Sequence, residues 1–160
     1  MSAQPAHDIR GVLITATGGR ILLPNASVAE VITFSEPEQV PNAPSWLLGR
    51  SRWRGWALPI VSFARLAGWA TEEHEFGAKI AVLKAIGGNA ALPYFGVLTQ
   101  GFPRLVTIST ANLQETSDHG AALPVGIHAE VLFSDDDAVV PDLVAVEQLL
   151  ADVLGLAAKA

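Results

Sequence analysis

The sequence predicts a mainly β protein that contains two compact β-units and ends in a helix. Short apolar runs recur along the chain between Gly, Pro and Asn turn signals, as they do in all-β domains. Gly18-Gly19 and Gly87-Gly88 each separate two such runs, which is typical of β-hairpins. The pattern Ala-x-Gly-Gly-x-x-x-Leu-Pro occurs at 16–24 and again at 85–93. This repeat indicates two similar β-units about 70 residues apart.

Composition limits the class of protein. A chain of 160 residues, half of them apolar and 16% charged, fits one domain spanning residues 1–160. The absence of cysteine excludes disulfides, thiolate metal ligands and cysteine nucleophiles. The N-terminus lacks the pattern of a secretory signal, and no apolar run reaches the roughly 20 residues of a spanning helix. We therefore expect a soluble, cytoplasmic protein without direct membrane insertion.

The charge distribution argues against nucleic-acid binding. The net charge is −6, and from Leu105 onward one basic residue, Lys159, stands against nine acids. Nucleic-acid binding needs Lys and Arg spread over a face to neutralise phosphates. The small arginine cluster near residue 50 is better suited to a specific acidic partner.

The first hairpin comprises Val12–Thr15 and Arg20–Leu23. After it, Ser27-Val28-Ala29-Glu30 resembles a capping box, which predicts one helical turn to about Ile32. Val28 and Val31 would then share a face. Glu30 has two open interpretations, a helix cap or a partner contact.

The segment from Pro41 to Trp69 contains all four tryptophans and four of the ten basic residues. After the proline-rich connector Glu36–Pro44 come an apolar anchor (Trp46–Leu48), a bend at Gly49, and an edge strand at Arg50–Gly55 that runs into a turn. Alternation places Arg50, Arg52 and Arg54 on one face of this strand, with Ser51 and Trp53 on the other. Three like charges on one face repel each other unless acids approach them, which favours a contact surface. Core packing is the simpler interpretation of the tryptophans.

The remaining elements follow in order. Leu58–Val61 is a returning strand, and Ser62 caps a short helix at Phe63–Ala67 that Gly68 ends. The later segments are an acidic linker (Thr71–Gly77), a second hairpin (Lys79–Ala85 and Ala91–Thr99), a strand (Leu105–Ser109), a polar loop (Thr110–Gly120) and one or two strands (Leu123–Phe133). The C-terminal helix starts near Pro141, and Glu147, Gln148 and Asp152 lie opposite its apolar stripe (Leu143, Val146, Leu149, Leu150, Val153, Leu154).

No pattern indicates catalysis, a metal or a cofactor. The four histidines, His7, His74, His119 and His128, lie far apart, and neither a nucleophile elbow nor a phosphate-binding Gly-rich loop is present. Asp135-Asp136-Asp137 is interpreted as a solvated hairpin tip because no further calcium-loop spacing follows. We therefore expect a protein that is not an enzyme.

One alternative comes from Arg50-x-x-x-Arg54. It matches the first half of the pattern in cyclic-dinucleotide-binding β-barrels, where paired arginines grip phosphates. That pattern continues downstream with Asp/Asn-x-Ser-x-x-Gly. Here Asn25-Ala26-Ser27 lies upstream, and Glu30 occupies the position of the glycine. A cyclic-dinucleotide sensor using Arg50 and Arg54 is therefore the second hypothesis.

Several motifs resemble the CheW family of chemotaxis coupling proteins. They are Val28-Ala29-Glu30-Val31, Pro41-x-x-Pro44-x-Trp46-Leu47-Leu48-Gly49, Trp53-Arg54-Gly55 and Leu58-Pro59-Ile60-Val61. The resemblance implies two five-stranded β-barrels around a shared core. It also implies a non-catalytic adaptor that connects the cytoplasmic tip of a chemoreceptor to the regulatory domain of a CheA-type histidine kinase.

The resemblance also implies which residues bind partners. They are Val28, Glu30, Val31, Gly49, Arg54 and Gly55. Arg52-Trp53 replaces the usual Asn-Leu of the family, so these two residues would alter the contact surface. Such divergent versions resemble accessory couplers of type IV pilus (twitching) chemosensory systems. Because the matching Glu and Arg both lie in the family's binding region, we predict that Glu30 and Arg54 form an ion pair.

Overall fold

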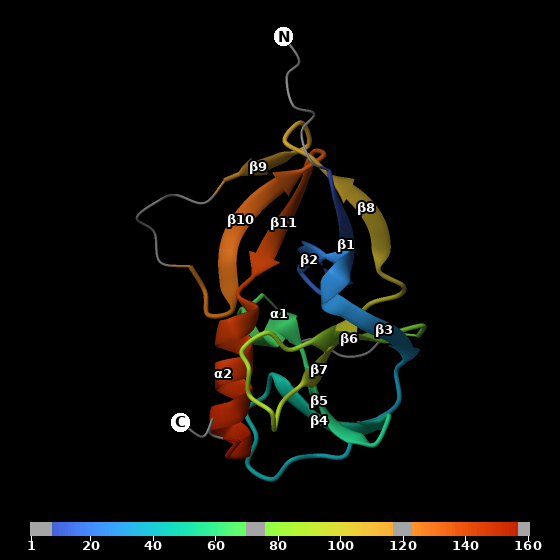
Figure 1. The fold of residues 1–160 in the computed structure, drawn as a ribbon, viewed down its shortest axis with the longest axis vertical. Helices are drawn as coiled ribbons and strands as arrows, with labels where there is room; N and C mark the ends of the chain where they lie inside the picture. Colours follow the sequence, from blue (N-terminus) through green and yellow to red (C-terminus); the bar gives the residue numbers. More distant parts are fainter. Residues whose placement is uncertain (1–7, 70–75, 117–122, 157–160) are drawn as a thin grey trace.

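The computed structural model describes residues 8–69, 76–116 and 123–156, which form two β-sheets, two helices and a 3₁₀ turn (Figure 1). The upper sheet in Figure 1 has the strand order β8-β1-β2-β11-β10-β9, and the lower sheet has the order β3-β6-β7-β5-β4. The strands of the upper sheet are β1 (Ile9–Ala16), β2 (Gly19–Pro24), β8 (Arg104–Ile108), β9 (Leu113–Glu115), β10 (Ile127–Phe133) and β11 (Asp136–Pro141). Those of the lower sheet are β3 (Val28–Thr33), β4 (Leu47–Trp53), β5 (Trp56–Val61), β6 (Lys79–Lys84) and β7 (Tyr94–Thr99). The remaining elements are η1 (Asn25–Ser27), α1 (Phe63–Leu66) and α2 (Leu143–Leu154).

The two sheets share the same strand connectivity and pairing over five strands. In each, a hairpin (β1–β2 or β6–β7) pairs antiparallel with one further strand, β8 or β3. The second strand of that hairpin then pairs in parallel with another hairpin, β10–β11 or β4–β5, and a helix follows. The predicted mainly β fold with two similar units is thus confirmed, and β9 is an addition to the upper unit.

Three apolar clusters hold the fold together. The largest lies between the sheets and takes side chains from both sheets and both helices, including Ile14, Val61, Phe95 and Leu150. A second cluster belongs to the upper sheet and a third to the lower sheet. The largest cluster therefore joins the two units, and each sheet adds a smaller cluster of its own.

The structure confirms the predicted hairpins around Gly18-Gly19 and after Lys79. It also confirms the cap of α1, where the Ser62 hydroxyl accepts a hydrogen bond from the Arg65 amide at 3.3 Å. The Ser134-Asp135 tip between β10 and β11 confirms the interpretation of the aspartate run as a hairpin end. The predicted linker Thr71–Gly77 lies mostly outside the described residues. The predicted polar loop Thr110–Gly120 contains β9, which pairs with β10 through Leu113–Glu115.

The predicted helical turn from Ser27 to Ile32 is wrong. Residues Val28–Thr33 form strand β3, and only the 3₁₀ turn Asn25–Ser27 precedes it. β3 pairs antiparallel with β6, and a bulge falls between Val28 and Glu30. The β-branched residues Val28, Val31 and Ile32 favour a strand, and pairing across the sheet outweighs the local capping pattern. Glu30 is therefore not a helix cap.

Helix α2 begins later than the sequence predicts, and although Val146 and Leu150 of the predicted stripe are buried, Val153 is exposed. Pro141 ends β11, and Asp142 is the N-cap, whose carboxylate accepts from the Ala145 amide at 3.0 Å. The buried residues of the helix are Val146, Glu147, Leu150 and Ala151. Glu147, predicted on the polar side, is only 5% exposed and accepts hydrogen bonds from the amides of Ile86 (3.0 Å) and Gly87 (2.7 Å). These two bonds compensate for the burial of a carboxylate.

Candidate partner-binding surface

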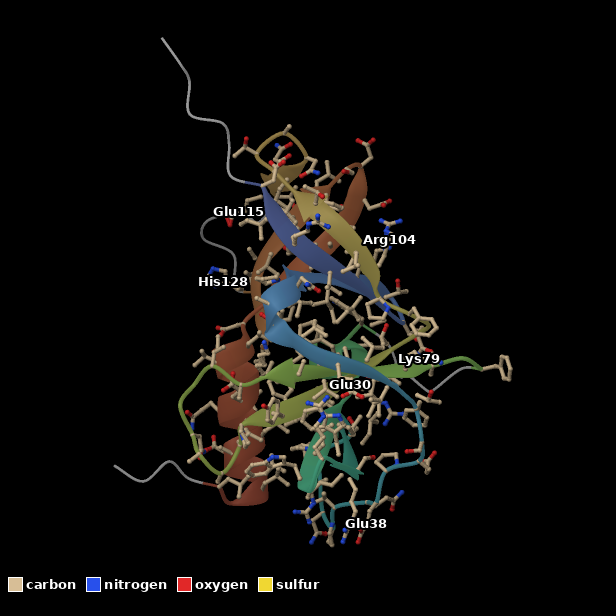
Figure 2. The ribbon with its side chains drawn as sticks, turned by 45° about the vertical axis from the view of Figure 1, so that its right-hand side comes forward. Glu30, Glu38, Lys79, Arg104, Glu115 and His128 are labelled. Atoms are coloured by element: carbon tan, nitrogen blue, oxygen red, sulfur yellow. The ribbon has the colours of Figure 1, made fainter. Side chains whose placement is uncertain are left out.

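The two edge strands of the lower sheet approach each other at Glu30 and Arg54. Glu30 lies on β3 at one edge, and Arg54 follows β4 at the other, yet Arg54 Nη2 is 2.6 Å from Glu30 Oε1. The predicted ion pair is therefore confirmed. Since the sheet order separates β3 from β4 by three strands, the sheet must curl into a half-barrel to bring these side chains together. Figure 2 shows Glu30 near the middle of the molecule, on β3.

The β4–β5 turn directs Arg54 toward β3. Arg54 and Gly55 both have positive φ, 46° and 80°, and Trp53 pairs with Trp56 across the turn. Positive φ at both central residues is the geometry of the type I′ hairpin turn. Arg54 thus lies in the turn and not in the strand, so the prediction that it shares a strand face with Arg50 and Arg52 is wrong. Gly55 is exposed and meets this backbone requirement without steric cost.

Two aromatic side chains, Trp53 and Tyr94, support the guanidinium of Arg54. Its guanidinium carbon lies 4.7 Å from the centroid of the Trp53 ring, and Trp53 meets Tyr94 edge-on with centroids 4.8 Å apart. Trp53 is only 6% exposed and belongs to the core of the lower sheet, as predicted, whereas Trp56 is exposed, so core packing does not account for all four tryptophans. Cation–π contact and the ion pair therefore fix the position of a side chain that is 65% exposed.

Val28 and Val31 of β3 and Gly55 of the β4–β5 turn are the other predicted partner-binding residues near this pair. Val28 and Val31 are half-buried on β3, and Val31 lies outside the three apolar clusters formed by the described residues. Val31 follows Glu30 directly, so its accessible apolar side chain lies on the opposite face of β3 from the ion pair. We name the group Val28, Glu30, Val31, Arg54 and Gly55 the β3–hairpin seam.

Gly49 lies apart from the seam and has a backbone role. It is buried in β4 with φ of 142°, and a Cβ added there would collide with the carbonyl oxygen of Glu38. Glu38 and Arg50 exchange two backbone hydrogen bonds of 2.8 Å. Gly49 therefore lets the connector that begins at Glu36 lie against β4.

Arg50 and Arg52 lie on the outer face of β4, away from the core of the half-barrel. Both are exposed, whereas Ser51 and Trp53, with which they alternate, are half-buried and buried, as predicted. Arg50 lines a hollow of about 160 Å³. Because Arg54 crosses to Glu30 while Arg50 stays on the outer face, the two arginines do not converge as a cyclic-dinucleotide site would require.

Sequence reasoning missed the residues that come from distant segments. Tyr94 supports Trp53, and the hollow beside Arg50 takes residues from β5, from 91–94 and from the end of α2. Another hollow, of about 520 Å³, lies along the connector and includes Phe34, Arg65 and Leu98. No sequence motif links these positions, since they meet only through folding.

Within the described residues there is no group of three or more His, Asp or Glu side chains placed to hold a metal ion. His128 lies on β10, away from the seam in Figure 2, and the other three histidines lie outside the described residues. In the part of the chain that the structure describes, no helix is long and apolar enough to cross a membrane.

Comparisons with known proteins point in the same direction as the fold. The family model described as CheW-like domain matches residues 10–153. A crystal structure of the scaffolding protein TtCheW from Thermoanaerobacter tengcongensis is similar, with a TM-score of 0.71 and 14% sequence identity. The match covers 89% of this chain and 91% of that one. The comparison with curated proteins finds no match.

Proposed function

The chain belongs to the family of CheW-like domain proteins and is a chemosensory coupling adaptor, and we propose that it binds its partners through the β3–hairpin seam. The carrying observation is the Glu30–Arg54 pair, which joins the two edges of the half-barrel at an accessible position. The proposed partners are the cytoplasmic tip of a chemoreceptor and the regulatory domain of a CheA-type histidine kinase. The proposed role is non-catalytic and cytoplasmic.

The seam has the physical properties of a binding contact. Two side chains of opposite charge are held in a fixed orientation, so little side-chain entropy is lost when a partner covers them. The Trp53 ring packs against the Arg54 guanidinium and gives the pair a rigid base. Arginine is among the residues most often found where binding energy concentrates. Gly49 and Trp53 support this surface through the packing of β4, whereas Arg52 lies on the outer face of that strand, outside the seam.

The test measures binding and stability on the same variants. We expect Arg54→Ala to weaken capture of the kinase regulatory domain or of the receptor tip about tenfold or more, as loss of a central arginine contact does. Its free energy of unfolding should fall by only about 0–1 kcal/mol, because the ion pair is solvent-exposed. Surface plasmon resonance on immobilised partners and urea unfolding give the two quantities.

Arg104→Ala is the matched control, because Arg104 is exposed on β8 in the other sheet (Figure 2). It removes the same charge from the protein and should leave capture unchanged. If both variants lost binding equally, the loss would be explained by the change in net charge and not by a contact of Arg54. Normal capture by Arg54→Ala would place the binding surface elsewhere.

We further propose that the chain serves as an accessory coupler of a pilus-based, twitching system, because Arg52-Trp53 departs from the usual residues of the family. Parallel capture against regulatory domains from a pilus system and a flagellar system tests this assignment. Preference for the flagellar kinase would reject it.

Calorimetry with cyclic dinucleotides tests the second hypothesis, a cyclic-dinucleotide sensor using Arg50 and Arg54. The diverging positions of these two arginines do not favour it.

A further inference from the structure

We propose that the outer face of the β4–β5 hairpin is a second binding surface, which takes an acidic segment of a partner protein and seats one apolar side chain of it beside Arg50. This surface is separate from the β3–hairpin seam and does not depend on the Glu30–Arg54 pair. Two independent features carry the proposal, an apolar hollow beside Arg50 and a pair of exposed arginines, Arg50 and Arg52, on the same face of β4.

The hollow has room for one side chain of medium size. Its volume is about 160 Å³. An apolar cavity of about 150 Å³ holds a benzene molecule, so a leucine or phenylalanine side chain is of the right size. Ala57 and Pro59 of β5 line it beneath Arg50, and Leu154 and Leu156 line it from the end of α2. Its other lining residues are Trp56, Ala91, Leu92, Pro93 and Tyr94.

Trp56 makes the hollow a favourable place for binding energy. It is 43% exposed, although it is among the largest apolar side chains in the protein. A tryptophan at the side of an apolar hollow offers a large rigid contact area with few rotatable bonds. A partner side chain that entered the hollow would cover part of this ring.

The arginines determine the charge of the occupant. Arg50 and Arg52 point to the same side of β4, about 7 Å apart along the strand. Among the described residues, neither forms an ion pair, whereas Arg54 pairs with Glu30 and Arg20 with Asp136. Two exposed arginines on a protein of net charge −6 complement carboxylates flanking an apolar residue.

Protection of a sheet edge is the simpler explanation of these charges. Edge strands often carry basic residues that prevent pairing with other chains. That explanation accounts for Arg50 and Arg52 but not for the apolar hollow against which Arg50 lies. In addition, Glu38 already pairs with the backbone of Arg50 at 2.8 Å, so the edge is covered there. The partner segment therefore crosses the outer face and does not extend the sheet.

The experiment uses a defined peptide and fluorescence anisotropy with the full chain. The probe is a fluorescein-labelled peptide with one leucine flanked on each side by two glutamates. Two matched peptides replace either the leucine by alanine or the glutamates by glutamine. We expect each replacement to weaken binding about fivefold or more, since both the anchor and the charges contribute.

Protein variants assign the binding to this face. Arg50→Ser and Arg52→Ser should each weaken binding of the acidic peptide about fivefold, while Arg104→Ser on the other sheet should not. Ala57 lies directly opposite Arg52 across the hairpin, so Ala57→Glu places a carboxylate beside that arginine within the protein. This variant should keep its stability and lose binding, and the size-matched Ala57→Gln should bind more tightly than it.

Each remaining outcome overturns the proposal. Absence of binding by the acidic peptide does so, as does equal weakening by Arg104→Ser, which would mean unspecific charge attraction. Equal binding of the alanine peptide would reject the hollow as the anchor site. Glu30→Ala is expected to bind the peptide normally, so failure of the seam as a receptor or kinase site is distinguished from failure of this surface.

Discussion

Gly49 is the residue on which the shape of the binding region depends most directly. It lets the connector pair with β4 through Glu38 and Arg50, and any side chain there would meet the Glu38 carbonyl. The resemblance to known couplers placed Gly49 among the partner-binding residues. In the structure it is buried, so we propose that it affects binding by holding the connector and β4 in place.

We predict that Gly49→Ala lowers the free energy of unfolding by about 2 kcal/mol or more, because it adds both a backbone collision and an unfavourable φ. Gly55→Ala is the matched control, since Gly55 also has positive φ but no atom within 4 Å of an added Cβ. It should lose only about 1–2 kcal/mol, the cost of the left-handed conformation. Urea unfolding of both variants gives the difference. Equal losses would show that the connector moves aside without cost.

The Glu30–Arg54 pair also belongs to the residue scale. A double-mutant cycle of Glu30→Ala and Arg54→Ala should give a coupling energy for folding of about 0–1 kcal/mol, because both side chains are accessible to water. Thermal or urea unfolding of the four proteins measures it. A coupling energy near 3 kcal/mol would instead make the pair a structural clamp of the half-barrel.

At the scale of elements, α2 is attached to the lower sheet through its buried acid. The Glu147 carboxylate accepts hydrogen bonds from the amides of Ile86 and Gly87. The side chain of Asn89 donates a hydrogen bond of 2.6 Å to the Leu156 carbonyl. These contacts connect the helix after β11 of the upper sheet to the loop between β6 and β7 of the lower one. The helix therefore joins the two units along one side of the molecule (Figure 1).

We predict that Glu147→Ala destabilises the protein by about 2–3 kcal/mol, because it leaves two amides without their acceptor and removes buried contacts. Gln148→Ala, on the exposed side of the same helix, should change stability by less than about 0.5 kcal/mol. Chemical unfolding followed by tryptophan fluorescence compares the two. A small effect of Glu147→Ala would mean that water replaces the carboxylate at little cost.

At the scale of the whole molecule, the two units share one core. The largest cluster contains side chains from both sheets, and each sheet has only a small cluster of its own. A unit that lost its neighbour would expose most of that cluster to water, and small units rarely bury enough apolar area alone. We therefore propose that residues 10–153 fold as a single domain.

Calorimetry should accordingly show one unfolding transition, with equal calorimetric and van't Hoff enthalpies. Leu22→Ala in the upper sheet and Ile80→Ala in the lower sheet should both shift that single transition to lower temperature, by roughly 2–5 kcal/mol of lost stability each. Two separate transitions, or a variant that melts only one sheet, would show that the units are independent.

Local signals in the sequence determined much of the fold. The Gly18-Gly19 turn, the pairing of the two hairpins and the Ser62 cap depend on neighbouring residues, and the structure confirms them. Gly87-Gly88 instead lies within a longer loop between Lys84 and Tyr94. The exposed position of Arg50 and Arg52 followed from simple alternation along β4. Such features are encoded within a few residues, where turn geometry and side-chain period decide the outcome.

The tertiary structure decided what depends on distant partners. The segment Val28–Thr33 carries both a capping pattern and β-branched residues, and its pairing with β6 selects the strand. Glu147 is buried because amides some 60 residues away in the sequence donate hydrogen bonds to its carboxylate. Helical periodicity does not reveal these distant donors. Glu30 and Arg54 meet only because the sheet curls until its edges approach. Family resemblance predicted that meeting, whereas the residues alone did not, since long-range closure leaves no local pattern in the sequence.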